Sequence, residues 1–195
     1  MTKKLYLSWT GVGLAILLAT GCGTHGNAAN ASTLKAANQT SGDTATTTGI
    51  SVGADAPDFS LTKLNGQATV SLKDLLGSKP IILNAFASWC GPCKQEAPDL
   101  ASLAKQYEGK VSVIGIDMTA EDSVSGAKQF VSDYHLTFPI LLDKQGAFLS
   151  QYQLVGFPTT FLISPAGKIE AVHVGILTKS QMQSLFQQAV QTKGV

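Results

Sequence analysis

Two of the chain's three cysteines lie in the segment FASWCGPCKQEAP, residues 86–98. The C-x-x-C spacing of Cys90 and Cys93 fits a redox-active pair, half of a zinc site, or two inert buried thiols. A structural zinc ion takes four ligands, whereas the chain has one such pair and three scattered histidines. The pattern therefore favours redox chemistry over zinc, and the Gly-Pro between the thiols argues against an inert pair.

The elements around this pair are expected to activate one of its sulfur atoms. The apolar run KPIILNAFASW, residues 79–89, predicts a central strand covered on both faces, and a helix should then run from the pair to about Tyr107. Pro92 suits the first helical turn, where its missing N–H costs nothing. Unpaired N–H groups and the helix dipole stabilise a thiolate at such a helix start. We therefore expect Cys90 to be the acidic, accessible, attacking thiol and Cys93 to resolve the mixed disulfide.

The N-terminus has the parts of an export signal. Lys3 and Lys4 precede an uncharged apolar run at residues 5–20, and small residues follow. The segment LATGC resembles a bacterial lipobox, in which cleavage before Cys22 is followed by lipidation of that cysteine. We therefore predict a lipoprotein-type signal peptide at residues 1–21 and attachment to the cell membrane through Cys22. A plain signal peptide, giving a secreted protein, and an uncleaved anchor are the alternatives.

Composition divides the rest of the chain into a tether and one folded domain. Residues 22–49 are rich in Thr, Ala, Asn, Gly and Ser, have almost no large apolar residues, and predict a flexible tether. Residues 50–195 carry the apolar runs of a globular domain. The formal net charge of +1 provides no basic surface for nucleic acid and no acidic tail.

Strands alternate with helices in the domain, which predicts an α/β fold. A hairpin is expected near residues 59–72, with its turn at Asn65-Gly66 and a short helix at 73–76 after it. Further strands are expected in KVSVIGIDM, FPILLD, TTFLIS and KIEAVHVG, and further helices at residues 123–134, in AFLSQYQL and in TKSQMQSLFQQAV.

The motifs WCGPC and GFPTTFLI, with Pro98 five residues after Cys93, resemble the thioredoxin superfamily. The longer pattern PDFSL, NG, VSLKDLLG and ILNAFASWCGPCKQEAP is similar to the ResA/TlpA group of membrane-tethered extracytoplasmic thiol–disulfide oxidoreductases. This resemblance implies a thioredoxin fold with an N-terminal β-hairpin extension and a helix-containing insertion before the third core strand. It also implies a central mixed sheet flanked by helices.

The resemblance also assigns roles to particular residues. It implies that Cys90 and Cys93 form the redox-active disulfide and that Pro158 is a cis-proline beside it. Glu96, three residues after the second cysteine, would share a helix face with Cys93 and accept its proton. Asn84 stands where thioredoxin has a buried acid and cannot take a proton, which strengthens the case for Glu96.

The substrate is expected to bind around the disulfide. The expected substrate-binding residues are Trp89, Gly91, Pro92, Phe157 and Pro158. A cis bond after Phe157 would leave backbone groups of residues 156 and 157 available to an extended substrate segment.

The function that the resemblance implies is reduction of protein disulfides outside the cytoplasm, for example in apocytochrome c. A membrane thiol donor would return the electrons; no organic cofactor or metal is implied, and we expect a monomer.

Two alternative functions share the fold. A peroxiredoxin-like peroxidase shares the opening motifs, but NAFASWC lacks the P-x-x-x-T-x-x-C pattern. A Sco-like copper-binding assembly factor would use C-x-x-x-C with a distant histidine such as His135 or His173, whereas this chain has C-x-x-C.

Overall fold

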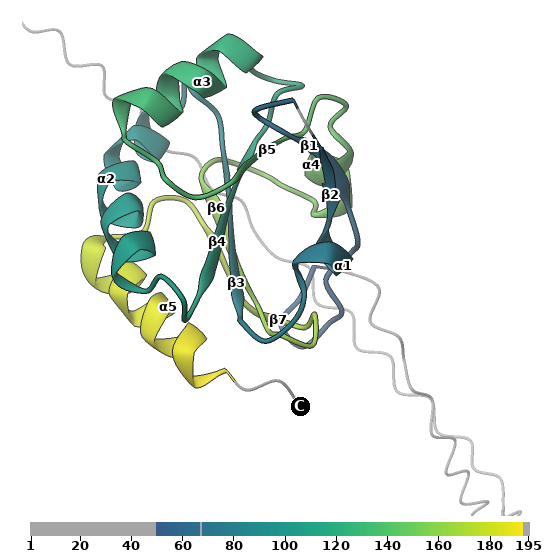
Figure 1. Cartoon of the computed structure of the whole chain (residues 1–195), viewed down its shortest axis with the longest axis vertical. Helices are drawn as coiled ribbons and strands as arrows, with labels where there is room; N and C mark the ends of the chain where they lie inside the picture. The colour runs from purple at the N-terminus through teal and green to yellow at the C-terminus, as the bar shows by residue number, and fades with distance from the viewer. Residues whose placement is uncertain (1–49, 67, 193–195) are drawn as a thin grey trace, which may run out of the picture. The chain divides into compact units, whose positions relative to one another are not determined.

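A seven-stranded mixed sheet forms the centre of the domain in the computed structural model, which describes residues 50–66 and 68–192 (Figure 1). The strand order is β2-β1-β5-β4-β3-β6-β7. The strands are β1 (Ser60–Lys63), β2 (Thr69–Ser71), β3 (Ile81–Phe86), β4 (Ser112–Asp117), β5 (Ile140–Leu142), β6 (Thr159–Ile163) and β7 (Ile169–Val174). The predicted signal peptide and tether lie outside the described residues.

Strand β3 lies near the middle of the sheet and leads directly to the cysteine pair. It pairs parallel with β4 and antiparallel with β6, and all six of its residues are buried. This agrees with its nearly continuous apolar sequence, because a strand covered on both faces needs no polar alternation. The parallel β3–β4 pairing also brings the end of β4 beside the start of the cysteine segment, with Phe86 opposite Asp117.

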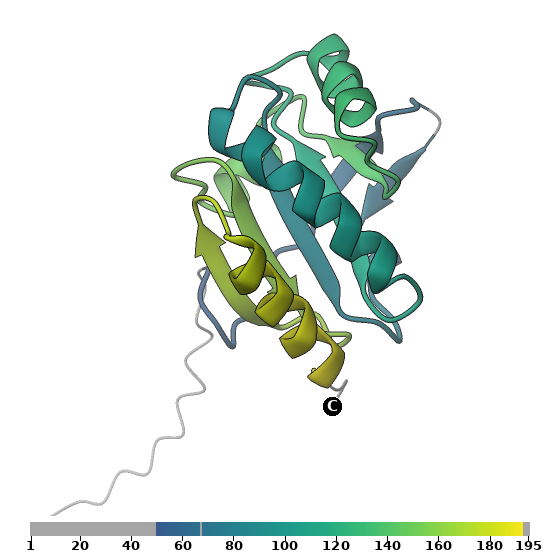
Figure 2. The same ribbon diagram turned by 90° about the vertical axis from the view of Figure 1, so that its left-hand side faces the viewer.

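Helices cover both faces of the sheet. Helices α2 (Gly91–Gln106), α3 (Val124–Asp133) and α5 (Lys179–Gln191) lie on the face seen in Figure 2, where α2 and α5 run side by side. Helices α1 (Leu72–Leu75) and α4 (Ala147–Gln151) lie on the other face (Figure 1). None of the helices in the described part of the chain is both long enough and apolar enough to cross a membrane.

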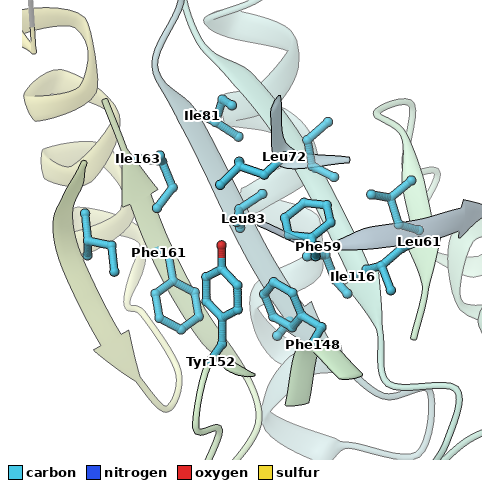
Figure 3. Close-up of a cluster of buried hydrophobic side chains, with 14 of the residues drawn as sticks. Phe59, Leu61, Leu72, Ile81, Leu83, Ile116, Phe148, Tyr152, Phe161 and Ile163 are labelled. Atoms are coloured by element: carbon cyan, nitrogen blue, oxygen red, sulfur yellow. The ribbon is translucent and has the colours of Figure 1, made fainter. Parts of the chain in front are cut away.

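An aromatic cluster fills the face under α1 and α4 (Figure 3). The rings of Phe148 and Tyr152 stack with centroids 4.0 Å apart, and Phe161 meets Tyr152 edge-on at 5.1 Å. The Tyr152 hydroxyl satisfies its polar end by donating to the Pro57 carbonyl at 2.7 Å. This core ties α4 and the segment before β1 to the sheet.

The thioredoxin-type α/β fold and its two additions are confirmed. Strands β1 and β2 form the N-terminal hairpin, and β1 joins the main sheet by antiparallel pairing with β5. The inserted segment before β6 carries β5 and α4. Helix α1 starts one residue earlier than predicted, at Leu72, because Ser71 and Asp74 form a capping box that ends β2 and begins the helix.

Candidate active site

The cysteine pair lies at the N-terminus of α2, as the sequence predicts. Cys90 is the N-cap residue of the helix, and its sulfur accepts a hydrogen bond from the Cys93 amide at 3.1 Å. The two residues form a disulfide with their Cα atoms 5.3 Å apart. Pro92 occupies the first turn. The Cys93 amide thus already points at the sulfur of Cys90, and the positive end of the helix would stabilise a thiolate at this position.

Both cysteines are buried in the disulfide form. Cys90 is 4% exposed and Cys93 is 2% exposed, so the expectation that Cys90 is accessible is wrong for this state. The capping geometry accounts for the burial, because the sulfur turns back over the helix start and lies in a cluster with Phe86 and Ala97. In this state the exposed residues beside the pair, rather than its sulfur atoms, form the accessible surface.

The predicted substrate-binding residues surround the disulfide. Trp89 is 58% exposed, and its ring meets Phe157 edge-on with centroids 6.0 Å apart. Gly91 and Pro92 are exposed, and Phe157 packs against the cluster that contains both cysteines. The Phe157–Pro158 peptide bond is cis, as predicted.

The backbone beside the cis bond is only partly available. The Gly156 carbonyl accepts from the Thr159 hydroxyl at 2.7 Å, and the Pro158 carbonyl accepts from the Gly175 amide at 2.8 Å. Within residues 50–66 and 68–192, no hydrogen bond engages the amide or the carbonyl of Phe157. Of the two residues expected to pair with a substrate, Phe157 therefore offers its backbone, whereas the Gly156 carbonyl already has a partner.

Glu96 lies one turn after Cys93 on the same helix face and is 2% exposed. Its Oε1 accepts from the Asn84 side-chain amide at 2.8 Å, and its Oε2 accepts from the Leu177 amide at 3.0 Å. The Asn84 amide also donates to the Thr160 hydroxyl at 3.1 Å. Both carboxyl oxygens of this buried acid thus have a donor, one from β3 and one from the loop before α5.

Burial dominates the proton affinity of Glu96. Desolvation raises its pKa, while the hydrogen bonds from Leu177 and Asn84 and the charge of nearby His173 oppose the rise. A carboxyl whose pKa is raised in this way accepts and returns a proton more readily than a solvated one.

Comparison with known proteins identifies the family. The AhpC/TSA family model matches residues 52–172. The chain belongs to the AhpC/TSA family. The Thioredoxin-like protein YneN of Bacillus subtilis is 43% identical over 136 residues, covering 69% of this chain and 78% of YneN. The Thiol-disulfide oxidoreductase ResA of Oceanobacillus iheyensis is 38% identical over 136 residues, covering 68% of this chain and 69% of ResA.

A solved structure agrees with this assignment. A putative Thiol:disulfide interchange protein DsbE from Chlorobium tepidum superposes with a TM-score of 0.65 at 30% identity, covering 72% of this chain and 99% of that chain. This member of the AhpC/TSA family is therefore a thiol–disulfide oxidoreductase of the ResA and DsbE type.

A second acidic region, which the sequence did not predict, supports the segment before Cys90. Asp122 in the β4–α3 loop accepts hydrogen bonds from the amide and the hydroxyl of Ser88, the latter at 2.7 Å. The neighbouring Glu121 carbonyl accepts from the Trp89 indole at 2.8 Å. Gly126 packs so closely against Ser88 that an added Cβ would overlap the Ser88 hydroxyl. This loop thus fixes the two residues that precede the pair.

Asp117 is buried behind this loop at the end of β4. Its Oδ1 accepts from the Thr119 hydroxyl at 2.7 Å, whereas its Oδ2 has no hydrogen-bond partner among the described residues. Desolvation, with the charge of Asp122 as a further contribution, raises the pKa of Asp117 to about 7. Partial burial opposes ionisation of Asp122, but donors from Ser88 and Ser123 hold its pKa below the ordinary value.

Three exposed apolar residues beside the site were also missed. Val155 is 85% exposed, Val174 is 52% exposed and Ile176 is 40% exposed. Val155 lies two residues before Phe157, and Val174 lies close to Gly156. Their signal in the sequence is weak, because an apolar residue at a strand end or in the loop beside it is equally typical of a core position.

The histidines considered for copper lie on different elements. His173 is in β7 and contacts the Ile176 carbonyl at 3.2 Å, whereas His135 follows α3 with a positive φ of 51°. Over residues 50–66 and 68–192, no three His, Cys, Asp or Glu side chains are grouped so as to hold a metal ion. The structure therefore does not bring either histidine together with the cysteine pair as a ligand set.

Proposed function

We propose that this protein reduces disulfides of substrate proteins outside the cytoplasm by dithiol exchange through Cys90 and Cys93. The observation that carries the proposal is the position of Cys90 as the N-cap of α2, with the Cys93 amide 3.1 Å from its sulfur. A thiolate formed there replaces the hydration it loses with helix N–H groups.

The reaction has two exchange steps. In the first, the Cys90 thiolate attacks one sulfur of the substrate disulfide, forms a mixed disulfide and releases one substrate thiolate. In the second, Glu96 takes the proton of Cys93, and the new thiolate attacks the Cys90 sulfur and releases the second substrate thiolate. Two electrons have then passed to the substrate, and the Cys90–Cys93 disulfide has formed.

The surface beside the disulfide supports a protein substrate. Trp89, Phe157 and the exposed side chains of Val155, Val174 and Ile176 provide apolar contacts. The amide and carbonyl of Phe157 are available to an extended segment. We propose that the segment flanking the substrate cysteine is extended and apolar, and apocytochrome c is one candidate substrate.

The proposal includes a cellular arrangement. We propose that residues 1–21 direct export, that Cys22 is lipidated, and that residues 22–49 tether a monomeric domain to the outer side of the membrane. A membrane thiol donor would then reduce the disulfide again. Mass spectrometry of the mature N-terminus in the membrane fraction tests this arrangement. An N-terminus other than a lipidated Cys22 would overturn the anchor.

Trapping experiments test the reaction itself. We expect Cys93→Ser to accumulate a mixed disulfide with a substrate protein, and Cys90→Ser to form none, because only Cys90 begins the exchange. Full reductase activity in Cys90→Ser would refute the assignment.

The direction of electron flow is tested by the reduction potential of the pair. Gly-Pro between the cysteines favours a potential near the thioredoxin value of about −270 mV, and a potential near the DsbA value of about −120 mV would instead indicate an oxidant.

Two further assays separate this function from its alternatives. We expect neither peroxide consumption at a rate comparable with disulfide reduction nor tight binding of copper(I) by the reduced protein. Rapid peroxide turnover would indicate a peroxidase, and tight copper binding would indicate an assembly factor.

A further inference from the structure

His173 and Glu96 bind the two ends of one peptide group. The His173 Nε2 atom lies 3.2 Å from the Ile176 carbonyl oxygen, and the Leu177 amide donates to Glu96 Oε2 at 3.0 Å. The Ile176 carbonyl and the Leu177 amide belong to the same planar peptide unit. Since a carbonyl oxygen only accepts, Nε2 carries the hydrogen in this contact. The imidazole is thereby linked to the buried carboxyl through a single peptide.

The sheet brings the same two residues together by a second route. His173 in β7 is paired with Thr160 in β6, and Thr160 is paired with Asn84 in β3. Directly opposed residues of antiparallel strands point to the same face. The Asn84 amide bonds both Thr160 and Glu96, so this row lies on the face that α2 covers. His173 therefore belongs to the polar row that supports Glu96.

We propose that His173 is a positioning residue for Glu96, because it polarises the Ile176–Leu177 peptide and so strengthens the amide that holds the carboxylate. Hydrogen bonds in series reinforce one another where the local dielectric is low. The inference rests on the proposed function, in which Glu96 takes the proton of Cys93. In its protonated form, His173 also attracts the carboxylate directly and opposes the effect of burial on the pKa of Glu96.

The imidazole ring of His173 is in contact with solvent. It is half-buried and lines a groove of about 360 Å³ between β7 and α5, together with Leu177 and the polar residues Ser180 and Gln181. The charged group that interacts with His173 is Glu96 of α2. Lys179, which begins α5 next to the groove residue Ser180, is paired with Asp99 of α2 at 3.7 Å. Thr160, from β6, carries no charge.

The direct test is a titration of the Glu96 carboxyl carbon by NMR in the full-length protein. The disulfide form is used because its cysteines do not titrate and cannot obscure the carboxyl. We expect the midpoint to rise by about half a pH unit or more in His173→Leu, because the carboxylate loses both the polarised amide and the nearby charge. His173→Gln keeps an N–H donor without the charge, so its midpoint should lie between those of His173→Leu and the wild type.

Two results would overturn the proposal. An unchanged midpoint in His173→Leu would show that the ring does not act on Glu96. Equal shifts in His173→Leu and His173→Gln would show that charge acts alone, without the peptide. His135→Asn is the matched control, because it removes another histidine at a left-handed position that Asn tolerates, and it should leave the midpoint unchanged.

The kinetics of the reduced protein separate this inference from the function on which it rests. The pH dependence of the resolving step should shift upward in His173→Leu and should not shift further when the same change is made in Glu96→Gln. A wild-type resolving rate in Glu96→Gln would contradict the proposed role of Glu96. The NMR titration would still report whether His173 acts on the carboxyl.

Discussion

Two buried acidic regions lie near the disulfide, and their hydrogen bonding differs. Glu96 has a donor on each carboxyl oxygen, from Asn84 and Leu177. Asp117 has one oxygen without a partner among the described residues and a second acid, Asp122, nearby. Burial raises the pKa of both Glu96 and Asp117. Two donors oppose the rise at Glu96, whereas at Asp117 the single donor Thr119 opposes it and the charge of Asp122 adds to it. We infer that the first region handles the proton of Cys93, whereas the second holds the loop that fixes Ser88 and Trp89.

The largest expected effect comes from Asp117→Asn and concerns stability. Folding raises the pKa of Asp117 from 3.8 to about 7, so its contribution to stability is complete below about pH 4 and is lost as the pH rises to 7. Asparagine resembles the protonated acid but does not ionise, so the free energy of unfolding of the variant does not fall in this pH range for this reason. We expect it to be more stable than the wild type by up to ~4 kcal/mol at pH 8, with a much smaller difference at pH 4.

Urea denaturation at the two pH values measures this difference. Asp133→Asn, which alters an exposed acid on α3, is the control and should behave as the wild type at both. If Asp117→Asn and the wild type were equally stable at pH 8, the inference that the buried Asp117 carboxylate destabilises the fold at this pH would be contradicted.

The next effect is on the reaction rather than on stability. Glu96→Gln removes the proposed proton acceptor of Cys93, and we expect the resolving step to slow about 100-fold. Stopped-flow measurement of the decay of a mixed disulfide on Cys90 tests this. Asp117→Asn should resolve at the wild-type rate. If Asp117→Asn slowed the resolving step as much as Glu96→Gln, the inference that only the Glu96 region handles the proton of Cys93 would be contradicted.

Asp122→Ala should have a smaller effect on stability. The amide and hydroxyl of Ser88 lose their acceptor, which should lower the free energy of unfolding by about 1–3 kcal/mol. Measurement at pH 5, where Asp117 is protonated, isolates this loss. At pH 8 the loss should be smaller, because Asp117 no longer faces a second charge. A larger loss at pH 8 than at pH 5 would show that the two acids do not repel each other.

The smallest expected effect concerns the indole of Trp89. Trp89→Phe keeps a ring beside Phe157 but loses the hydrogen bond to the Glu121 carbonyl, at a cost of about 0.5–1.5 kcal/mol. Thermal unfolding of the oxidised protein measures this change. An unaltered melting temperature would mean that the loop does not depend on this contact.

The sequence predicted the parts of the site that depend on local order along the chain. The strand, the C-x-x-C and the proline of the first turn are consecutive, so strand β3 and the start of α2 followed from residues 79–93 alone. The resemblance to a family motif predicts a cis peptide bond before Pro158, and this bond is cis in the structure.

The missed contacts join residues far apart in the chain. Ser88 and Asp122 are 34 positions apart, and Glu96 and Leu177 are 81 apart. The sequence indicates Glu96 as a candidate proton acceptor, but it indicates only that Asn84 cannot take a proton. The 2.8 Å hydrogen bond between the two side chains is visible only in the structure. Spacing along a helix or strand carries no information about which loop folds against it, so these contacts required the tertiary structure.

The central claim is that the start of α2 makes the sulfur of Cys90 the reactive one of the pair. The most direct measurement is the rate of alkylation of each cysteine in the reduced protein as a function of pH, with the two sites resolved by mass spectrometry. We expect Cys90 to react with a midpoint well below the value of about 8.5 for free cysteine, and Cys93 to react only at higher pH. Midpoints near the free-cysteine value at both sites would contradict the account.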